Sequence, residues 1–574
     1  MRASLLFALA ATFSTVAQAQ DAPESEDQPP LVDAPAPIVQ APPTPTVVVP
    51  RDWRGVFDAI DRGQWSSANA GIASLPASPL KALARAELYT ARNSPPIDLN
   101  SLLALIAEAP ELPHASQLAA MAVKRGATTA PLIMVPRRTV NLGSAPVRYR
   151  SRPVHGDPAA DQLRAILDQM VKADDASAAE VQLLTFAPTL TAEGRAEAGQ
   201  RVAFIYYIRG LDLDARRVAD TWRQGATGDW AGQAAWTSGL ASWRIGDFAA
   251  ASLAFQQAAQ LTSQRELRAG AYYWAARSEQ AAGRPRSVTT LLRYAAQSPE
   301  SFYGLVARET LGLETKLPRD PFVGFDPPVD HLPNVRRATE LVHMGRHSRA
   351  EELLRHQAKI GLTTEHHALI QVAKKLDLPA AQLWLANNGQ HGARSDAADR
   401  YPNPRWTPPG GWRVDPALAF GHVIQESSFR RAAVSPAGAV GLMQVRPGTA
   451  GDIARAKGIG VGSLTDVAMN LEYGQSFIEM MRGNRGTAGQ LPRVIASYNA
   501  GPVPVARWAS IYDKGDPLLW IESIPYWETR YYVPSILRNM WVYQGLNNRE
   551  TPTLREIAQH RWPAFPTGVN TLAH

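Results

Sequence analysis

The chain has 574 residues, of which 45% are hydrophobic and 19% are charged, and its formal net charge is +7. At about 150 residues per domain this length corresponds to roughly three to four domains, and the hydrophobic fraction excludes a wholly disordered chain. The sequence contains no cysteine, which excludes disulfides, iron–sulfur clusters, thiolate zinc sites and cysteine nucleophiles. The basic residues are scattered, so the charge does not indicate a nucleic-acid-binding protein.

The first residues have the pattern of an export signal. Arg2 supplies a positive charge, the apolar run 5–13 is too short to span a bilayer of about 30 Å, and Ala17-Gln18-Ala19 is a small-x-small cleavage site. We therefore predict a signal peptide over residues 1–19, with a buried N-terminal helix as the alternative. Residues 20–50 are rich in proline and predict an extended linker. No later stretch is long and apolar enough to predict a transmembrane helix.

Residues 51–400 are rich in Ala and Leu and have few strand signals. Within them a loose repeat returns with a step of about 38 residues, as in the pairs Trp236 and Trp274, and Phe255 and Tyr294. A repeat of this length predicts stacked helical hairpins that form an α-superhelix. We expect these aromatic side chains to lie in the core because they have helical spacing. Glycines are expected to end the first helix of each hairpin in the left-handed conformation; they are Gly63, Gly246, Gly283 and Gly345.

A stretch rich in proline and glycine, 401–411, precedes a region of different composition. Asp415-Pro416 is a typical helix start, and the apolar residues that follow predict a buried helix. Glu426 lies at the expected C-terminal end of this helix. Apolar surroundings and the negative end of the helix dipole both raise the pKa of a carboxyl group, as a general acid requires. The alternative is a surface glutamate that ends a helix.

Three further segments carry residues suited to a ligand groove. Residues 435–444 combine turn residues with an amide and a thioether. A helix is predicted to begin near Pro492 and to end at Gly501, with polar side chains in its last turn. Residues 524–533 gather four aromatic side chains, which can stack on sugars or fill a core, and a carboxylate that can pair with Arg530.

Taken in order, four blocks of sequence resemble the motifs of the soluble lytic transglycosylases. The blocks are Glu426-Ser427, 441–444 (Gly-Leu-Met-Gln), 497–501 (Ser-Tyr-Asn-Ala-Gly) and 528–532 (Glu-Thr-Arg-Tyr-Tyr). These enzymes cleave peptidoglycan in the bacterial envelope and have a lysozyme-like catalytic domain. The resemblance covers about residues 415–544, and segments 271–277 and 301–307 are similar to the helical superhelix of the long form of the family.

The resemblance implies a mainly α fold, with an N-terminal α-superhelix at 51–400, a lysozyme-like α-rich catalytic domain at 401–550 and a C-terminal tail at 551–574. It implies a periplasmic lyase acting on a polysaccharide, which cleaves the β-1,4 bond between N-acetylmuramic acid and N-acetylglucosamine and leaves 1,6-anhydromuramoyl ends. Its partners would be peptidoglycan strands and, through the helical region, other envelope proteins. No cofactor and no metal are expected.

By the same resemblance Glu426 would act alone as acid and base. Ser435 and Gln444 would hold substrate groups, and the side chains of the groove would be Met443, Tyr498 and Asn499. Glu528 and Tyr532 would position Glu426 and the sugar. Two alternatives stay open: a hydrolytic muramidase of goose-lysozyme type, which shares the fold, and a non-catalytic envelope scaffold that binds glycan.

The sequence departs from the family pattern at two places. Val503-Pro504-Val505 stands where the family has glycine and a basic residue, which predicts a stiffer loop. Pro534 is unusual so soon after Tyr532, and it predicts that the last long helix begins one turn late.

Overall fold

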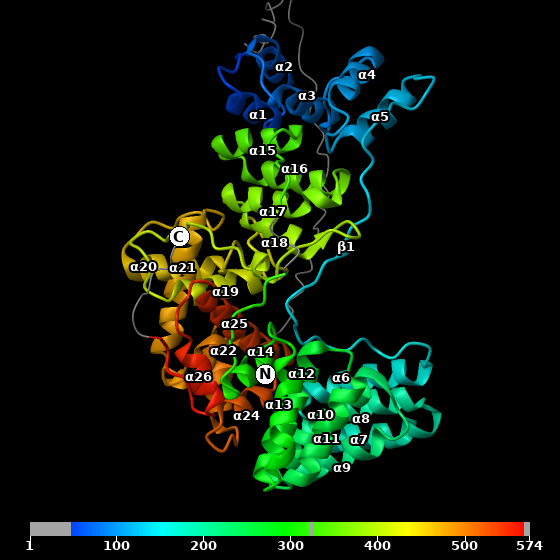
Figure 1. The fold of residues 1–574 in the computed structure, drawn as a ribbon, viewed down its shortest axis with the longest axis vertical. Coiled ribbons are helices and arrows are strands. Elements are labelled where there is room, and N and C mark those ends of the chain that lie inside the picture. The colour runs from blue at the N-terminus through cyan, green and yellow to red at the C-terminus, as the bar shows by residue number, and fades with distance from the viewer. Residues whose placement is uncertain (1–46, 321–325, 567–574) are drawn as a thin grey trace, which may run out of the picture. The chain divides into compact units, whose positions relative to one another are not determined.

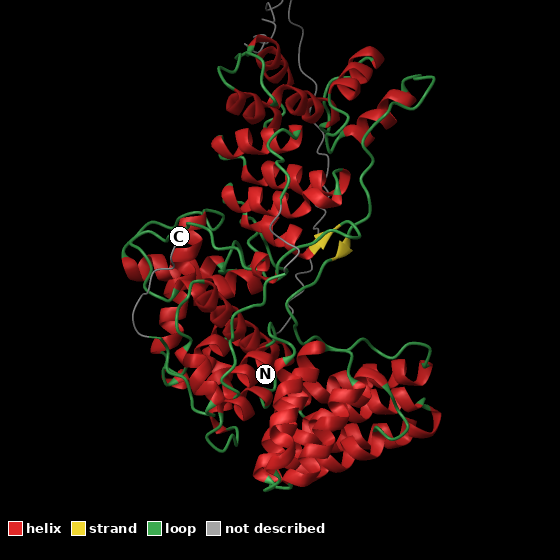
Figure 2. Ribbon diagram, viewed as in Figure 1, coloured by secondary structure: helices red, strands yellow, loops and turns green. Residues whose placement is uncertain are grey.

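The computed structural model describes residues 47–320 and 326–566 (Figure 1). The predicted signal peptide and most of the proline-rich linker lie outside these residues. The elements below belong to the unit formed by residues 49–574. Within the described residues the fold is almost entirely helical, and its only strands are β1 (Val140–Asn141) and β2 (Asn388–Gly389), which pair antiparallel (Figure 2). No described helix combines the length and hydrophobicity needed to cross a bilayer.

Nine helices from two distant parts of the sequence share one hydrophobic core. They are α1 (Trp53–Asp61), α2 (Trp65–Ser74), α3 (Leu80–Thr90), α4 (Leu99–Glu108), α5 (Ala115–Lys124), α15 (Pro333–His343), α16 (His347–Ile360), α17 (His366–Lys375) and α18 (Pro379–Asn387). Gly63 and Gly345 end the first helix of the pairs α1–α2 and α15–α16 with positive φ, as predicted. The helical region therefore contains a core that local sequence patterns do not reveal.

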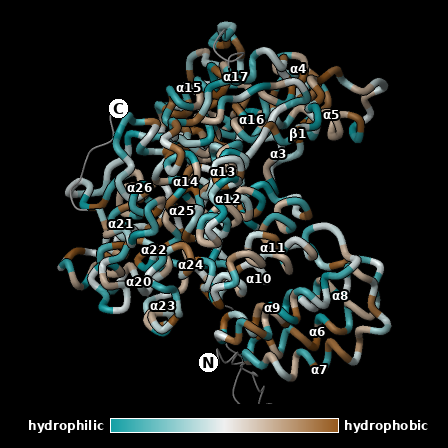
Figure 3. Tube along the Cα trace, turned by 60° about the horizontal axis from the view of Figure 1, so that its bottom comes forward, coloured by the Kyte–Doolittle hydropathy of each residue, from teal (hydrophilic) through white to brown (hydrophobic). Residues whose placement is uncertain are grey.

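The middle of the chain forms stacked helical hairpins (Figure 1). Its helices are α6 (Pro158–Ala173), α7 (Ala176–Phe186), α8 (Ala192–Ile208), α9 (Asp212–Trp222), α10 (Gly228–Ile245), α11 (Phe248–Leu261), α12 (Arg265–Ala281), α13 (Val288–Ala296) and α14 (Phe302–Thr310). Hydrophobic and hydrophilic residues alternate along these helices, as in α6 and α7 in Figure 3. Helix α6 buries one face, which carries Leu163 and Leu167, whereas α10 is buried all round from Trp230 to Ser242.

The repeated aromatic residues mostly lie where the sequence predicts. Trp236, Phe255 and Trp274 are buried, and the Phe255 ring lies 5.2 Å from Trp236 and 5.8 Å from Trp274 between centroids. Tyr294 is different: the prediction of a core position is wrong, because this side chain is 46% exposed and packs on Tyr272 at the surface. The repeat of about 38 residues thus predicts the helix pairs, but it does not predict which side chain of each pair is buried.

The C-terminal part contains eight helices and carries the predicted site. They are α19 (Pro416–Ser427), α20 (Pro447–Lys457), α21 (Val467–Gly483), α22 (Leu491–Ala500), α23 (Pro502–Arg507), α24 (Pro517–Glu522), α25 (Trp527–Leu546) and α26 (Pro552–Ala558). Short 3₁₀ turns join several helices along the chain: η1 (Ala187–Thr189), η2 (Pro285–Ser287), η3 (Thr363–Glu365), η4 (Ala397–Arg400), η5 (Arg485–Thr487) and η6 (Trp508–Ser510).

Two predictions for this part are wrong. Helix α25 begins at Trp527 and contains Pro534 in its interior, so the proline does not delay the helix. It lies in a buried part of α25, where tertiary packing outweighs the lost hydrogen bond. Residues 503–505 form part of helix α23, whose first residue is Pro502, rather than a loop.

A buried polar network joins the helical region to the C-terminal part. Glu522 at the end of α24 accepts hydrogen bonds from Arg148 (2.6 Å) and from the Tyr303 hydroxyl of α14 (2.8 Å). The Arg148 guanidinium also lies over the rings of Trp236 and Tyr531, at 4.9 Å from each centroid. One hydrophobic core extends across the same boundary, from α6 to Phe565. The candidate site is therefore built on a framework that includes the helical hairpins.

Candidate active site

Glu426 lies where the sequence predicts, in the last turn of α19. The Asp415 carboxylate accepts the Ala417 N–H at the start of this helix, and Pro416 is its first residue. Helix α19 packs closely on α25 at Gly421, whose carbonyl accepts a hydrogen bond of 3.1 Å from Asn539. The helix ends at Ser428, which has a positive φ of 51°. Packing along α19 thus directs Glu426 toward α25.

Glu426 is half-buried, and its carboxyl group is held by one tyrosine. Tyr532 of α25 donates its hydroxyl proton to Glu426 Oε1 at 2.5 Å. Burial raises the pKa of Glu426 from 4.5 to about 7, while the Tyr532 hydrogen bond lowers this pKa and the negative charge of Glu528 raises it. At neutral pH a large fraction of Glu426 therefore carries a proton, as a general acid must.

The histidine and the two tyrosines nearest to Glu426 are uncharged at neutral pH. His422, one turn earlier on α19, lies 2.7 Å from the Tyr532 hydroxyl through Nδ1, and burial lowers the pKa of His422 to about 3. The Tyr498 ring of α22 packs against His422 at 4.4 Å between ring centroids, with the ring planes tilted by 42°. Burial and the nearby Glu426 charge raise the pKa values of Tyr498 and Tyr532 well above that of free tyrosine. Neither the imidazole nor the phenols therefore carry charge at neutral pH.

A loop after α19 closes one side of the site and is held by Asn470. The Asn470 side chain accepts the Met443 N–H at 2.8 Å and donates to the Val440 and Leu464 carbonyls. The Tyr498 hydroxyl donates to the Met443 carbonyl at 2.7 Å, which ties α22 to the same loop. Asn470 was not among the sequence-predicted site residues, and its role depends on contacts between distant segments.

Three residues predicted for the site lie on this loop. The Met443 side chain is fully buried and packs against Gly474, so Met443 contributes a carbonyl to the site instead of the expected groove-lining side chain. Gln444 has a positive φ of 48° and donates its amide N–H groups to the Ala433 and Gly441 carbonyls. The side-chain carbonyl oxygen of Gln444 takes part in neither of these bonds. Ser435 is half-buried in the turn and accepts the Ala439 N–H at 3.0 Å.

The remaining predicted residues lie on α22 and α25. Asn499, in the last turn of α22, accepts a hydrogen bond of 2.6 Å from Thr529 through Oδ1. Glu528 is exposed in the first turn of α25 and affects Glu426 through its charge. The predicted pairing of Glu528 with Arg530 is wrong: Glu528 is exposed, whereas Arg530 is buried and its guanidinium lies 3.9 Å from the Phe204 ring centroid in α8.

His422 and Thr529 were also missed by the sequence analysis. A polar residue four positions before Glu426, within an otherwise apolar run, is the signal that could have identified His422, because residues i and i+4 share a helix face. No comparable signal exists for Thr529. Within the described residues no group of three or more His, Cys, Asp or Glu side chains has the arrangement of a metal site.

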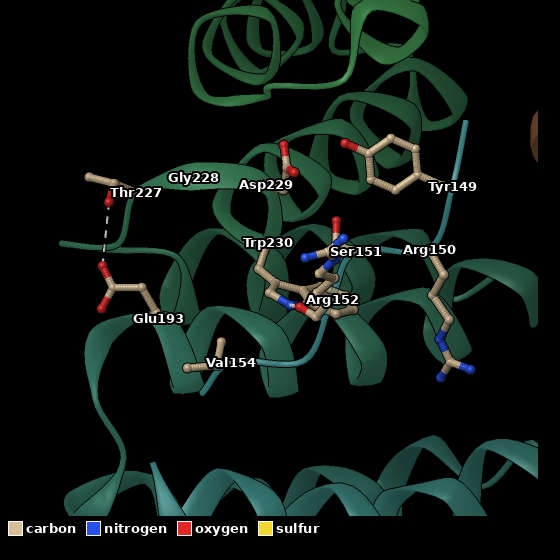
Figure 4. A pocket seen from close by; sticks show the side chains of 10 residues that line it. All are labelled: Tyr149, Arg150, Ser151, Arg152, Val154, Glu193, Thr227, Gly228, Asp229 and Trp230. Carbon is tan, nitrogen blue, oxygen red and sulfur yellow. Dashed lines mark hydrogen bonds between the residues drawn. The ribbon is translucent and has the colours of Figure 1, made fainter. Parts of the chain in front are cut away.

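A pocket of about 690 Å³ lies away from Glu426, in the helical hairpins (Figure 4). It is formed by segment 149–154 and the N-terminal ends of α8 and α10, with Trp230, Asp229 and Glu193 among its side chains. Asp229 accepts hydrogen bonds from Thr262 and Ser263, and Glu193 accepts one from Thr227, drawn as a dashed line in Figure 4. These carboxylates already have partners, and the pocket contains none of the predicted site residues.

Part of the region that contains Glu426 matches a known protein family. Residues 410–521 match the family described as "Transglycosylase SLT domain". The soluble lytic murein transglycosylase of Escherichia coli (strain K12) is 28% identical over 282 residues, which are 46% of this chain and 42% of that protein. A putative soluble lytic murein transglycosylase of Haemophilus influenzae is 33% identical over 146 residues, or 25% of this chain and 24% of that protein. The chain thus spans less than half the length of these curated relatives.

Solved structures show a similar fold over most of the chain. The 70 kDa soluble lytic transglycosylase Slt70 of Escherichia coli has a TM-score of 0.55 and 18% identity, covering 88% of this chain and 98% of that one. Its complex with bulgecin A has a TM-score of 0.56, also at 18% identity, with 89% and 98% covered. The fold class expected from the sequence is confirmed. Residues 410–521 therefore match a transglycosylase SLT domain, and the chain is similar in sequence to soluble lytic murein transglycosylases and in fold to Slt70, with a helical superhelix followed by a lysozyme-like domain.

Proposed function

We propose that this protein is a peptidoglycan lytic transglycosylase that cleaves the β-1,4 bond between N-acetylmuramic acid and N-acetylglucosamine and leaves a 1,6-anhydromuramoyl end. The observation that carries the proposal is the half-buried Glu426 within the SLT domain, with a pKa raised to about 7 by desolvation and one hydrogen bond from Tyr532. Such a carboxyl group can give up a proton and regain one near neutral pH.

In the proposed reaction Glu426 acts twice. The protonated carboxyl donates its proton to the glycosidic oxygen, the bond from that oxygen to muramoyl C1 breaks, and N-acetylglucosamine leaves with a free 4-hydroxyl. The resulting carboxylate then takes the proton of the muramoyl C6 hydroxyl as that oxygen attacks C1 and closes the anhydro ring. Glu426 is again protonated, and no water is consumed. An intramolecular nucleophile of this kind has a high effective concentration.

A single carboxylate suits this chemistry. Glycosidases that use two carboxylates place both close to the scissile bond. The negative charge of Glu528 raises the pKa of Glu426. Glu528 is exposed, and among the described residues no side chain or backbone group donates a hydrogen bond to its carboxylate. Asp452, on α20, is exposed and pairs with Arg455 on the same helix. The substrate's own 2-acetamido oxygen would stabilise the positive charge that develops at C1.

Four neighbouring residues would hold the sugars. Ser435 and Gln444 lie on the loop after α19, where the unused Gln444 carbonyl can accept an acetamido N–H. The hydrogen bond that Thr529 donates to Asn499 Oδ1 fixes the orientation of the Asn499 side-chain amide. Tyr498 donates its proton to a backbone carbonyl, which leaves the lone pairs of its hydroxyl oxygen for a cationic centre.

We also propose the domain limits and location that the sequence suggests. Residues 1–19 would be a cleaved signal peptide, 20–50 a linker, 51–400 the helical region, 401–550 the catalytic domain and 551–574 a tail, in a periplasmic protein. The helical region would bind other envelope proteins as well as support the catalytic domain. N-terminal sequencing of the secreted protein tests the cleavage site after Ala19.

Product analysis tests the proposed activity. Purified sacculi digested with the protein should release muropeptides with 1,6-anhydromuramoyl ends, which are lighter by one water than the corresponding reducing ends, as measured by mass spectrometry. Glu426→Gln should abolish release, whereas Asp452→Asn, which removes a surface carboxylate, should leave it unchanged. Products with ordinary reducing ends would show a hydrolytic muramidase, and binding of sacculi without any release would show a scaffold. Either result would overturn the proposal.

A further inference from the structure

Three side chains form one hydrogen-bonded chain that ends at Glu426. The Tyr532 hydroxyl is 2.5 Å from Glu426 Oε1 and 2.7 Å from His422 Nδ1. A tyrosine hydroxyl has one proton to donate, and in the structure this proton goes to Glu426. The Tyr532 oxygen can therefore only accept from His422, so His422 must carry its proton on Nδ1.

The surroundings of His422 fix this arrangement. The imidazole is 1% exposed, lies four residues before Glu426 on α19 and packs against the tilted ring of Tyr498. It is neutral, because burial lowers the pKa of His422 to about 3. A neutral imidazole has one N–H, and a proton on Nδ1 leaves none on Nε2.

The consequence concerns the two oxygens of Glu426. While Tyr532 donates to Oε1, that oxygen is an acceptor, and the acid proton of a neutral carboxyl must be on Oε2. Without the N–H from His422, the Tyr532 oxygen is free to accept, and a protonated Glu426 can turn its own O–H toward Tyr532. The acid proton would then be held by the protein instead of facing the glycosidic oxygen.

We propose that His422 is a positioning residue that acts through Tyr532 to keep the acid proton of Glu426 on Oε2, where it can reach the substrate. This inference rests on the proposed function, because it assigns a role in the same proton transfer. His422 itself does not touch the sugar.

Substitutions at position 422 test the role in turnover. His422→Phe keeps a flat ring against Tyr498 and removes the donor, and we expect kcat to fall about tenfold, which corresponds to one hydrogen bond of about 1.4 kcal/mol, with KM unchanged. His422→Asn restores an N–H near the Nδ1 position and should recover most of the rate. In a Tyr532→Phe background, His422→Phe should cause no further loss, since its effect passes through the missing hydroxyl. An equal loss in both backgrounds would overturn the proposal.

The tautomer of His422 can also be measured directly by NMR, which does not depend on enzymatic activity. Selective ¹⁵N labelling of the 12 histidines, with His422→Asn used to assign the signal, should show His422 protonated on Nδ1. His366 is an internal reference: its Nε2 lies 2.9 Å from the Leu385 carbonyl, so it must carry the opposite tautomer. Observation of His422 protonated on Nε2 would refute the proposal. If the wild-type protein releases no anhydromuropeptides while His422 shows the Nδ1 tautomer, the proposed function fails and the side-chain geometry stands.

Discussion

Replacement of Glu426 by glutamine should stabilise the protein at alkaline pH. A buried carboxyl group with a raised pKa is more costly to ionise in the folded protein than in the unfolded chain. The pKa of Glu426 is about 7 in the folded protein against an ordinary value of 4.5. At about 1.4 kcal/mol for each pH unit, this difference corresponds to about 3 kcal/mol. Glutamine avoids the cost, and its Oε1 can still accept the hydrogen bond from Tyr532.

The sign of the effect depends on pH. Below about pH 4.5, Glu426 is protonated in both the folded and the unfolded protein, so wild type and Glu426→Gln should be equally stable. Between about pH 4.5 and 7 the unfolded chain ionises first, and the wild type loses stability relative to the variant. Above about pH 7 the full difference of about 3 kcal/mol is reached.

Urea unfolding of both proteins from pH 4 to pH 8, followed by tryptophan fluorescence, measures this difference. Asp452→Asn is the matched control, because it removes one carboxylate from an exposed position whose side chain is 68% accessible. The control should show no pH-dependent gain. A Glu426→Gln difference that is the same at pH 4 and pH 8 would refute the assignment of a buried, protonated acid.

Further predictions concern rate, framework and packing. Turnover should decline above about pH 7 as Glu426 loses its proton, measured as anhydromuropeptide release across pH. Glu522→Gln should destabilise the fold by about 3 kcal/mol in urea unfolding, because it leaves a buried guanidinium uncompensated; a change as small as that of Asp452→Asn would contradict this. Gly474→Ala should lower activity, since its Cβ would lie 2.0 Å from the Met443 sulfur, while Gly448→Ala, with open space around it, should not.

Local signals were sufficient to predict the helix that carries Glu426. Asp415 and Pro416 mark its start, the apolar residues after them indicate burial, and Glu426 lies at its end, as the structure shows. The end of α22 at Gly501 was equally predictable, because glycine there adopts a positive φ of 83°. Each of these features depends on a few neighbouring residues, so the sequence alone was enough to place them.

Contacts between distant segments were not predictable in this way. Nothing near Pro534 indicates that α25 continues through it, since the packing that permits this comes from other helices. Arg530 was expected to pair with Glu528 and instead lies over Phe204, more than 300 residues earlier in the sequence. The same reason explains why the shared core of α1–α5 and α15–α18 was missed.

If Glu426 acts as proposed, the neutral groups around it explain how one carboxyl group can serve as both acid and base. His422, Tyr498 and Tyr532 are neutral near pH 7 because burial disfavours their charged forms. Among the side chains described in contact with this site, Glu426 is then the group whose charge changes at that pH. A reaction in which the acid gives one proton and regains one leaves the net charge of such a buried site unchanged at the end of each turnover. Under the proposed mechanism, a site of such low polarity offers few groups to hold an ordered water molecule, and the C6 hydroxyl of the sugar itself then supplies the nucleophile.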